Sequence, residues 1–326
     1  MKKSKIFTIV ACGAVALVLT CVLIVGLGSD GLISDPKTLG PRNNSQSYEV
    51  DPADTPVSSI EIIWQDGPVT FGESSDEKIH ITESSHKKID DGDKLELSVK
   101  SKTLSLRWDG KWYRRWFTLG LGLRDKALEI LLPKSILENL QSLEVSNTSG
   151  DITIGSAVSE ELEVSSVSGR LMLNSCTAAE NAYISTVSGD ISLKDLSCAE
   201  KMDISTVSGA MEISGIDADH MVLNSVSGAT EFRGHAGILK ANSVSGDITA
   251  ALDSCPPDVN LDTVSGRLTL VLPRSSEFTA DYDTLSGDFD TDFPAAKDGS
   301  QVKVGSGSAK ISLNTTSGSM EILAAS

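Results

Sequence analysis

The nine residues Ser-Thr-Val-Ser-Gly-Asp-Ile-Ser-Leu at 185–193 decide the fold, because a close copy, Ser-Thr-Val-Ser-Gly-Ala-Met-Glu-Ile, follows at 205–213. Related phrases recur on both sides, about 20 residues apart for most of the C-terminal half. Each copy contains a Ser-Gly pair, and the glycines stand at Gly150, Gly169, Gly189, Gly209, Gly228, Gly246, Gly266, Gly287, Gly307 and Gly318. A fixed period of this length is the signature of a repeat architecture.

Apolar and polar residues alternate on both sides of each Ser-Gly pair. Around Gly189, Ala182 and Ile184 come before the pair, and Ile191 and Leu193 come after it. Alternation with period two predicts strands that bury one face. An odd number of positions separates the two apolar pairs. In a straight strand the second pair would therefore face the opposite side, so the chain is expected to bend at Ser-Gly. Glycine at the bend tolerates a positive φ.

A single unit of strand, corner, strand and loop cannot bury its apolar face alone, but stacked units bury a continuous column. The sequence therefore predicts an all-β protein, a single-stack β-solenoid of ~20-residue Ser-Gly repeats over residues 143–326. Propeller blades of ~40–50 residues and nine-residue calcium-binding rolls fit the period less well. Residues 49–142 carry less regular strand patterns and are expected to form irregular opening rungs, with a helical turn at 134–140.

The N-terminus predicts a membrane anchor. Lys2, Lys3 and Lys5 precede an uncharged apolar run at 6–27, and about 20 such residues span a bilayer. Basic residues favour the cytoplasmic side, so residues 1–5 are expected inside the cell and the rest of the chain outside it. A signal-anchor is preferred over a lipoprotein cleavage box ending at Cys12. Residues 28–48 are expected to link this transmembrane helix to the ectodomain.

Charge argues against nucleic-acid binding. The chain holds 28 basic and 45 acidic residues, a formal net charge of −17. Binding of phosphate needs a basic face, which this body does not offer. Cysteines outside the membrane segment are Cys176, Cys198 and Cys255, an odd number at irregular spacing. They are interpreted as small apolar residues, with a disulfide between Cys176 and Cys198 as the alternative.

The phrase Leu-Glu-Ile-Leu-Leu-Pro at 128–133, then Leu-Glu-Val-Ser-Asn-Thr-Ser-Gly-Asp-Ile-Thr-Ile at 143–154 and the later Ser-Val-Ser-Gly-Asp-Ile units, resembles the bacterial DUF4097 family, also labelled "putative adhesin". The resemblance covers about residues 50–326. It implies a β-solenoid, often membrane-anchored and linked to the cell envelope. It carries no catalytic residues over to this chain.

One segment differs chemically from the rest. Residues 107–124 hold three of the four tryptophans and five basic residues against one acid. Aromatic and arginine side chains are favoured at membrane interfaces and at protein contacts. The segment is equally interpreted as a cap that covers the open end of the solenoid, a role that is compatible with a contact site. The predicted partner or membrane contact consists of Trp108, Trp112, Tyr113, Arg114, Arg115, Trp116 and Phe117.

No catalytic, cofactor or metal residues are predicted. A nucleophilic serine needs a base and an oxyanion site, and the repeated Ser-Gly pairs cannot each have them. Asp151, Asp190, Asp247 and Asp288 follow the corner glycine and are interpreted as turn-stabilising, with calcium binding or glycan cleavage as alternatives. The predicted function is non-enzymatic binding at the cell envelope, in adhesion or in stress sensing through a membrane-protein partner. The alternative is a carbohydrate-active β-helix enzyme.

Overall fold

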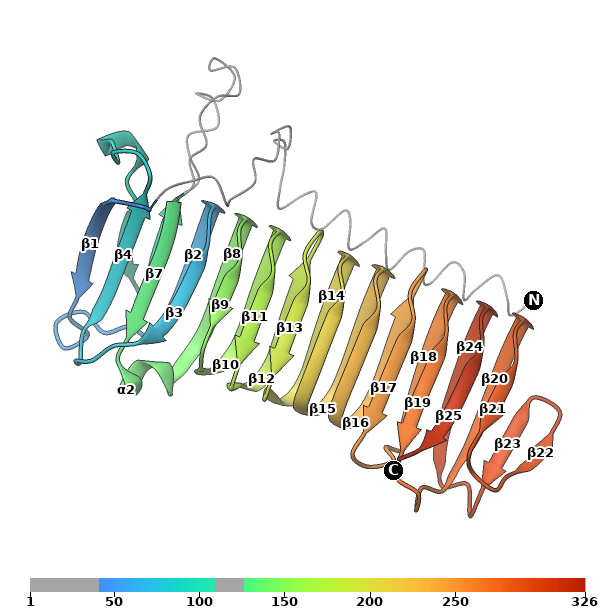
Figure 1. Cartoon of the computed structure of the whole chain (residues 1–326). Coiled ribbons are helices and arrows are strands. Elements are labelled where there is room, and N and C mark those ends of the chain that lie inside the picture. The colour runs from blue at the N-terminus through green and yellow to red at the C-terminus, as the bar shows by residue number, and fades with distance from the viewer. Residues whose placement is uncertain (1–40, 109–125, 326) are drawn as a thin grey trace.

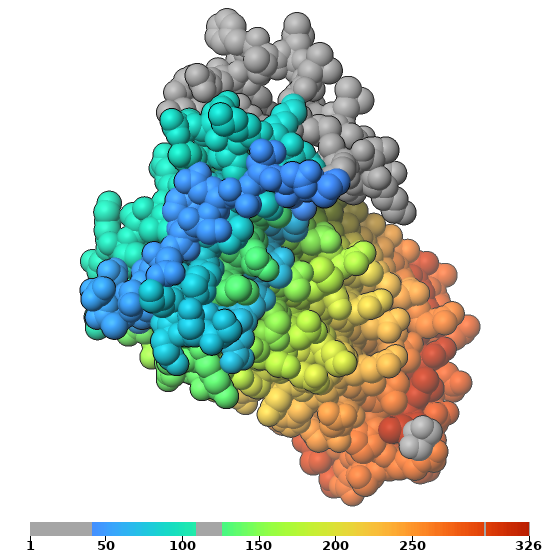
Figure 2. Space-filling model, turned by 60° about the vertical axis from the view of Figure 1, so that its left-hand side comes forward, coloured from blue at the N-terminus to red at the C-terminus, as the bar shows by residue number. Residues whose placement is uncertain are grey.

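The structure is a computed structural model that describes residues 41–108 and 126–325. It is an elongated stack of strands, and the all-β prediction is confirmed (Figure 1). Figure 2 shows the N-terminal strands gathered at one end of the body and the later rungs following one another toward the other end. The segment predicted to span a membrane, residues 6–27, lies outside the described residues. Within the described ranges, no helix is long and apolar enough to cross a bilayer.

Two parallel ladders make up the stack. The long ladder contains, in spatial order, β6 (Thr103–Trp108), β2 (Ser59–Asp66), β8 (Leu140–Ser149), β10 (Ala157–Ser168), β12 (Cys176–Thr186), β14 (Ser197–Ser208), β15 (Met211–Ser227), β16 (Thr230–Ser243), β18 (Asp258–Ser265), β24 (Ala309–Ser317) and β20 (Phe278–Ser286).

The short ladder lies across the corner from the long one, and β15 and β16 run through both. Its other strands are β7 (Lys126–Leu132), β3 (Val69–Glu73), β9 (Ile152–Ile154), β11 (Leu171–Asn174), β13 (Ile191–Lys194), β17 (Ile248–Leu252), β19 (Leu268–Leu272), β25 (Met320–Ala324) and β21 (Phe289–Thr291).

Antiparallel strands close the two ends. At the N-terminal end, β5 (Glu96–Lys100) pairs with β6, while β4 (Ile79–Ser85) joins β7 to β1 (Asn44–Val50). At the other end, β23 (Gln301–Val304) pairs with β20 and β22 (Ala296–Asp298). The short helices are η2 (Asp91–Asp93) and α2 (Lys134–Leu137), and α2 lies where the helical turn was predicted.

Rung order departs from chain order at both ends. The first rung in the sequence, β2 with β3, lies between the β6/β7 rung and the β8/β9 rung. Likewise, β24 with β25 lies between the β18/β19 rung and the β20/β21 rung. The rungs at both ends are therefore not stacked in the order of the sequence. Strand β1 also begins inside the segment expected to be a linker.

Aliphatic side chains fill the interior in continuous columns. Val164, Ile184 and Ile204 are fully buried and directly in register on successive long strands. Leu171, Ile191 and Met211 form the matching column on the short ladder. Burying one such side chain contributes roughly 1.5–3 kcal/mol, so repetition along the stack supplies the stability.

The corner glycines are required by close approach. A Cβ on Gly209 would lie 2.0 Å from the carbonyl oxygen of Gly189, and a Cβ on Gly189 would lie 2.0 Å from that of Gly169. Gly189 and Gly209 do not have a positive φ, so close approach alone requires glycine there. The expected positive φ is present at other corners: Gly150, Gly169, Gly287 and Gly318. The same crowding joins Gly67 to Gly150 and Gly287 to Gly318. Successive rungs meet backbone to backbone at this edge.

Gly307 departs from the predicted set of corners. Its amide donates to the carbonyl of Val304 at 3.1 Å, in the turn that joins β23 to β24. A Cβ there would meet side chains of Thr279 and Lys303 rather than another glycine. The turn, not the stack, sets its φ of 75°. Gly307 follows Gly287 by 20 residues, so its spacing in the sequence did not distinguish it from a corner.

Cys176 and Cys198 are free thiols. The register places Cys198 beside Ala178 and Cys176 beside Ala157, so the cysteines do not face each other in the ladder. Burial raises the pKa of the Cys176 thiol to about 12. These side chains act as small apolar core residues, as the irregular spacing suggested.

We predict that Gly209→Ala lowers the free energy of unfolding by a few kcal/mol, because the new methyl group forces neighbouring rungs apart. Chemical denaturation of the full chain in detergent, followed by far-ultraviolet circular dichroism, measures the change. Gly155→Ala is the control, since a Cβ there would lie at an ordinary 3.9 Å from the carbonyl oxygen of Phe71. Equal stability of the two variants would contradict the stacking explanation.

Candidate functional site

The aromatic and basic segment connects β6 to β7 at the N-terminal end of the body. Of the predicted contact residues, only Trp108 is described, and its side chain is 3% exposed. Trp108 therefore belongs to the core. The other predicted contact residues lie outside the described residues, and their role stays a prediction: Trp112, Tyr113, Arg114, Arg115, Trp116 and Phe117.

A buried charged cluster holds the two ends of this segment. Trp108 ends β6 and packs against Trp64 of β2, with ring centroids 4.8 Å apart. Lys126 begins β7, and its Nζ lies 4.4 Å from the Trp108 ring centroid and 5.3 Å from that of Trp64. Glu83 of β4 forms an ion pair with the same ammonium group. Both charged side chains are almost fully buried, at 3% and 0% exposure.

Further hydrogen bonds stabilise this ion pair. The Tyr48 hydroxyl donates to Oε1 of Glu83 at 2.8 Å, and the amide of Leu95 donates to both carboxylate oxygens at 3.2 Å. Lys126 also donates to the backbone carbonyl of Asp93 at 2.7 Å. A buried pair is stable only when its remaining hydrogen-bonding groups are used in this way. The cluster fixes Trp108 and Lys126, the described residues on either side of the aromatic and basic segment.

The sequence contains a signal for this cluster, namely charged residues at inward-facing strand positions. In β7, Lys126 points to the same buried face of the strand as Leu128 and Ile130. Glu83 occupies the same inward phase in β4, after Ile79 and Ile81. A charged residue in the apolar phase of a strand indicates a buried charge that needs a partner.

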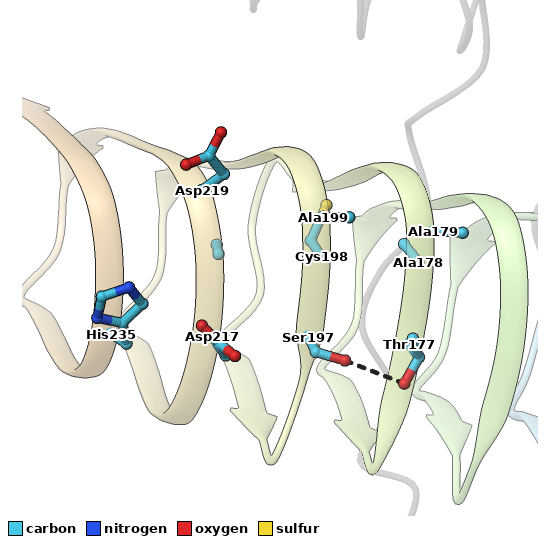
Figure 3. Close-up of a pocket in the computed structure, with 10 residues that line it drawn as sticks. Thr177, Ala178, Ala179, Ser197, Cys198, Ala199, Asp217, Asp219 and His235 are labelled. Carbon is cyan, nitrogen blue, oxygen red and sulfur yellow. Dashed lines mark hydrogen bonds between the residues drawn. The ribbon is translucent and has the colours of Figure 1, made fainter.

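A shallow groove of about 450 Å³ lies on another side of the stack, where the long strands change register (Figure 3). Small side chains line it, among them Ala178, Cys198 and Ala218, which are in register on successive strands. Ser197 donates a hydrogen bond of 3.0 Å to the Thr177 hydroxyl along one side. Cys198 lines it too, but burial raises the pKa of its thiol and so keeps it protonated. The groove follows from small residues in register.

The aspartates that follow the corner glycines link neighbouring rungs. Oδ1 of Asp151 accepts from the amide of Arg170 at 2.9 Å. Asp190 accepts in the same way from Ala210 at 3.0 Å, and Asp247 from Arg267 at 2.7 Å. The predicted structural role of these residues therefore has a specific form, a bond to the next rung rather than to the local turn. Within the described ranges, no group of His, Cys, Asp and Glu has the arrangement of a metal site.

The outer face of the long ladder presents small polar side chains in one continuous column. The register aligns Ser146, Ser165, Ser185, Ser205, Asn224, Asn242, Asp262 and Asn314, which we name the outer polar column. Its members bond to one another between rungs. Ser146 and Ser165 lie 2.9 Å apart through their hydroxyls, and Asn242 donates to Asn224 at 3.0 Å. This face is hydrophilic, and its members are partly exposed except for Ser205, which is buried.

We predict that Glu83→Gln destabilises the protein by about 3–5 kcal/mol, because it leaves the Lys126 ammonium buried without its counter-charge. Denaturation followed by tryptophan fluorescence reports the change, since Trp64 and Trp108 line the cluster. Adding Lys126→Met to this variant should restore much of the loss. A double variant no more stable than Glu83→Gln alone would show that the pairing is not the cause.

Stability should also fall above about pH 10. Burial, and then the hydrogen bond to Glu83, raise the pKa of Tyr48. Because the folded state binds this proton more tightly than the unfolded chain, the contribution is complete below the ordinary tyrosine pKa of about 10 and is lost at higher pH. Unfolding at pH 8 and pH 11 measures it. In Tyr48→Phe the decrease should be smaller, and an identical decrease would refute this origin.

A family model described as Toastrack DUF4097 matches residues 57–323. Three solved structures are similar in outline: a "putative adhesin" from Bacteroides fragilis (14% identity, 86% of this chain and 98% of that chain, TM-score 0.43), a "putative lipid binding protein" from Parabacteroides distasonis (12%, 87% and 98%, 0.40) and a "putative cell adhesion protein" from Clostridium sporogenes (12%, 86% and 99%, 0.26). These TM-scores carry no argument about function. No curated protein matches the chain. The family match covers most of the sequence, so the chain belongs to the Toastrack DUF4097 family.

Proposed function

We propose that this chain is a non-enzymatic binding protein of the cell envelope, active in adhesion or in envelope-stress sensing. The outer polar column is the observation that supports binding most directly. It presents hydroxyl, amide and carboxylate groups at the ~4.8 Å strand spacing on a closely stacked backbone. Such a surface suits recognition of an extended partner and does not need to enclose it.

The corner aspartates favour binding over catalysis. Glycoside cleavage needs two carboxyl groups at a set separation on either side of the scissile bond. Asp151, Asp190 and Asp247 instead each hold a backbone amide of the next rung. Their carboxylates thus have a structural use that would be lost if they were engaged by a substrate.

The location is the second part of the proposal. Residues 6–27 anchor the protein in the membrane as an uncleaved signal-anchor, the three N-terminal lysines stay in the cytoplasm, and the β-body lies outside. The contact with a membrane protein or the bilayer is made by six aromatic and basic residues: Trp112, Tyr113, Arg114, Arg115, Trp116 and Phe117. Sensing then passes into the cell through that partner.

Anchoring predicts that the full chain stays in the membrane fraction after alkaline carbonate washing, whereas a chain lacking residues 6–27 does not. External protease should degrade the β-body in intact protoplasts or spheroplasts. Protection of the β-body until the membrane is opened would place it on the cytoplasmic side and would contradict the proposed orientation.

Binding is tested by crosslinking the full chain in its native membranes, beside a variant with Trp112, Arg114, Arg115 and Trp116 changed to Ala. A membrane protein that crosslinks to the wild type and is lost in the variant supports sensing through this segment. Retention on cell-wall glycan without a protein partner supports adhesion. Release of soluble sugars from the glycan, abolished by Asp190→Ala in a folded variant, would instead establish the enzymatic alternative.

A further inference from the structure

Tyr183 occupies an unusual position on the outer face of the long ladder. Its side chain is 42% exposed, and among the described residues no other aromatic side chain is as exposed. It projects from β12 in the outward phase, between the buried residues Ala182 and Ile184. Nothing in the packing of the core requires a ring at this position.

The neighbours of Tyr183 are polar and placed by register. Glu163 lies beside it on the preceding rung and Asp203 on the following one. One step along the strand direction, the outer polar column contributes Ser185, flanked by Ser165 on the preceding rung. An exposed ring thus stands between two carboxylates, beside a row of hydroxyls.

The ring is also held in place before any ligand arrives. Nζ of Lys201, on the next rung, lies 5.8 Å from its centroid and 2.8 Å from Oδ2 of Asp203. Both strands are hydrogen-bonded within the parallel ladder. A preformed site avoids part of the entropy cost of binding.

We propose that Tyr183 is the stacking platform of a binding site for an uncharged polysaccharide, a proposal that deepens the function proposed above and rests on it. The apolar C–H face of a sugar ring packs on the tyrosine ring. Sugar hydroxyls donate to the carboxylates of Glu163 and Asp203, and they accept from Lys201 and the serine hydroxyls. Hydrogen bonds to charged groups are the stronger ones and provide most of the polar recognition.

Charge decides against an anionic ligand. Residues 143–326 hold 10 basic and 26 acidic residues, and the ring lies between two of the acids. Such a surface repels nucleic acids and acidic glycans. A protein contact is disfavoured as well, because interface centres gather several apolar side chains and depend on desolvation. Tyr183 instead stands alone among small polar groups.

The continuous row of polar groups on the outer face favours a polymer as the ligand. The outer polar column continues beyond the ring through Asn224 and Asn242, so the same hydrogen-bonding groups are offered on successive rungs. Tyr183 and its neighbours lie on consecutive strands of an extended ladder. The site therefore fits an internal stretch of a polysaccharide.

The test is affinity electrophoresis of the full chain in mild detergent, through native gels that contain glycol chitin, hydroxyethyl cellulose, galactomannan or, as the anionic comparison, alginate. The wild type should be retarded by at least one of the neutral polymers. Tyr183→Ala should weaken this retardation at least tenfold, while Tyr183→Phe and Tyr183→Trp retain it. Leu285→Ala is the matched control, since it removes a side chain that is 67% exposed at the far end of the stack.

Unchanged melting of each variant confirms that it is folded. The proposal is overturned if no neutral polymer retards the wild type, if only alginate does, or if Tyr183→Ala binds like the wild type. These failures are distinct from failure of the proposed function. Glycan retention that ignores Tyr183, or a specific crosslinked partner without glycan retention, would preserve a binding role while removing this site.

Discussion

The contact of each corner glycine with the carbonyl of the glycine one rung away is the constraint on which the structure depends. At Gly209 and its neighbours a hypothetical Cβ would lie about 2 Å from that oxygen, so even alanine would separate the rungs. With the corner fixed, the two strands on either side of it are held in one phase. The aliphatic columns, the outer polar column and the bonds made by Asp190 and Asp247 all follow from that shared register.

A polar lining runs inside the stack beside the corner. Three residues before the corner glycines, the inward position holds Ser or Thr on most rungs, and Thr186, Thr206 and Ser243 are fully buried there. The hydroxyls of these three residues make no hydrogen bond within the described structure. Asn147 donates to the carbonyls of Gly67 and Gly150 at 3.0 and 2.9 Å. An aliphatic residue at position 147 would leave these two carbonyls without that donor.

Much of this architecture could be predicted from the sequence, because period-two alternation and the recurring glycine report directly on strands and corners. The order of the rungs could not be predicted, because β20 and β24 both have the alternating pattern of a strand that could pair with β18. Only the structure shows that β24 is the neighbour of β18. The prediction of a corner at Gly307 was wrong because a Ser-Gly pair in a turn has the same sequence as one at a corner. Tyr183 was missed because one aromatic residue in an outward phase breaks no pattern; its significance depends on exposure and on neighbours contributed by other rungs.

The interleaved ends have a consequence for the order of assembly. Residues 278–291 leave the ribosome before residues 309–324, yet the later segment occupies the edge of β18 and β19. The earlier segment carries its own corner glycine and can compete for that edge during synthesis. In correct assembly, residues 278–291 stay unpaired with β18 and β19 or are displaced from them by residues 309–324. This long-range pairing is therefore slower than the pairing of strands that are adjacent in the sequence. A nascent chain interrupted before residue 309 would therefore leave the edge of β18 and β19 exposed or mispaired. The native rung order can form only after residues 309–324 have been synthesised.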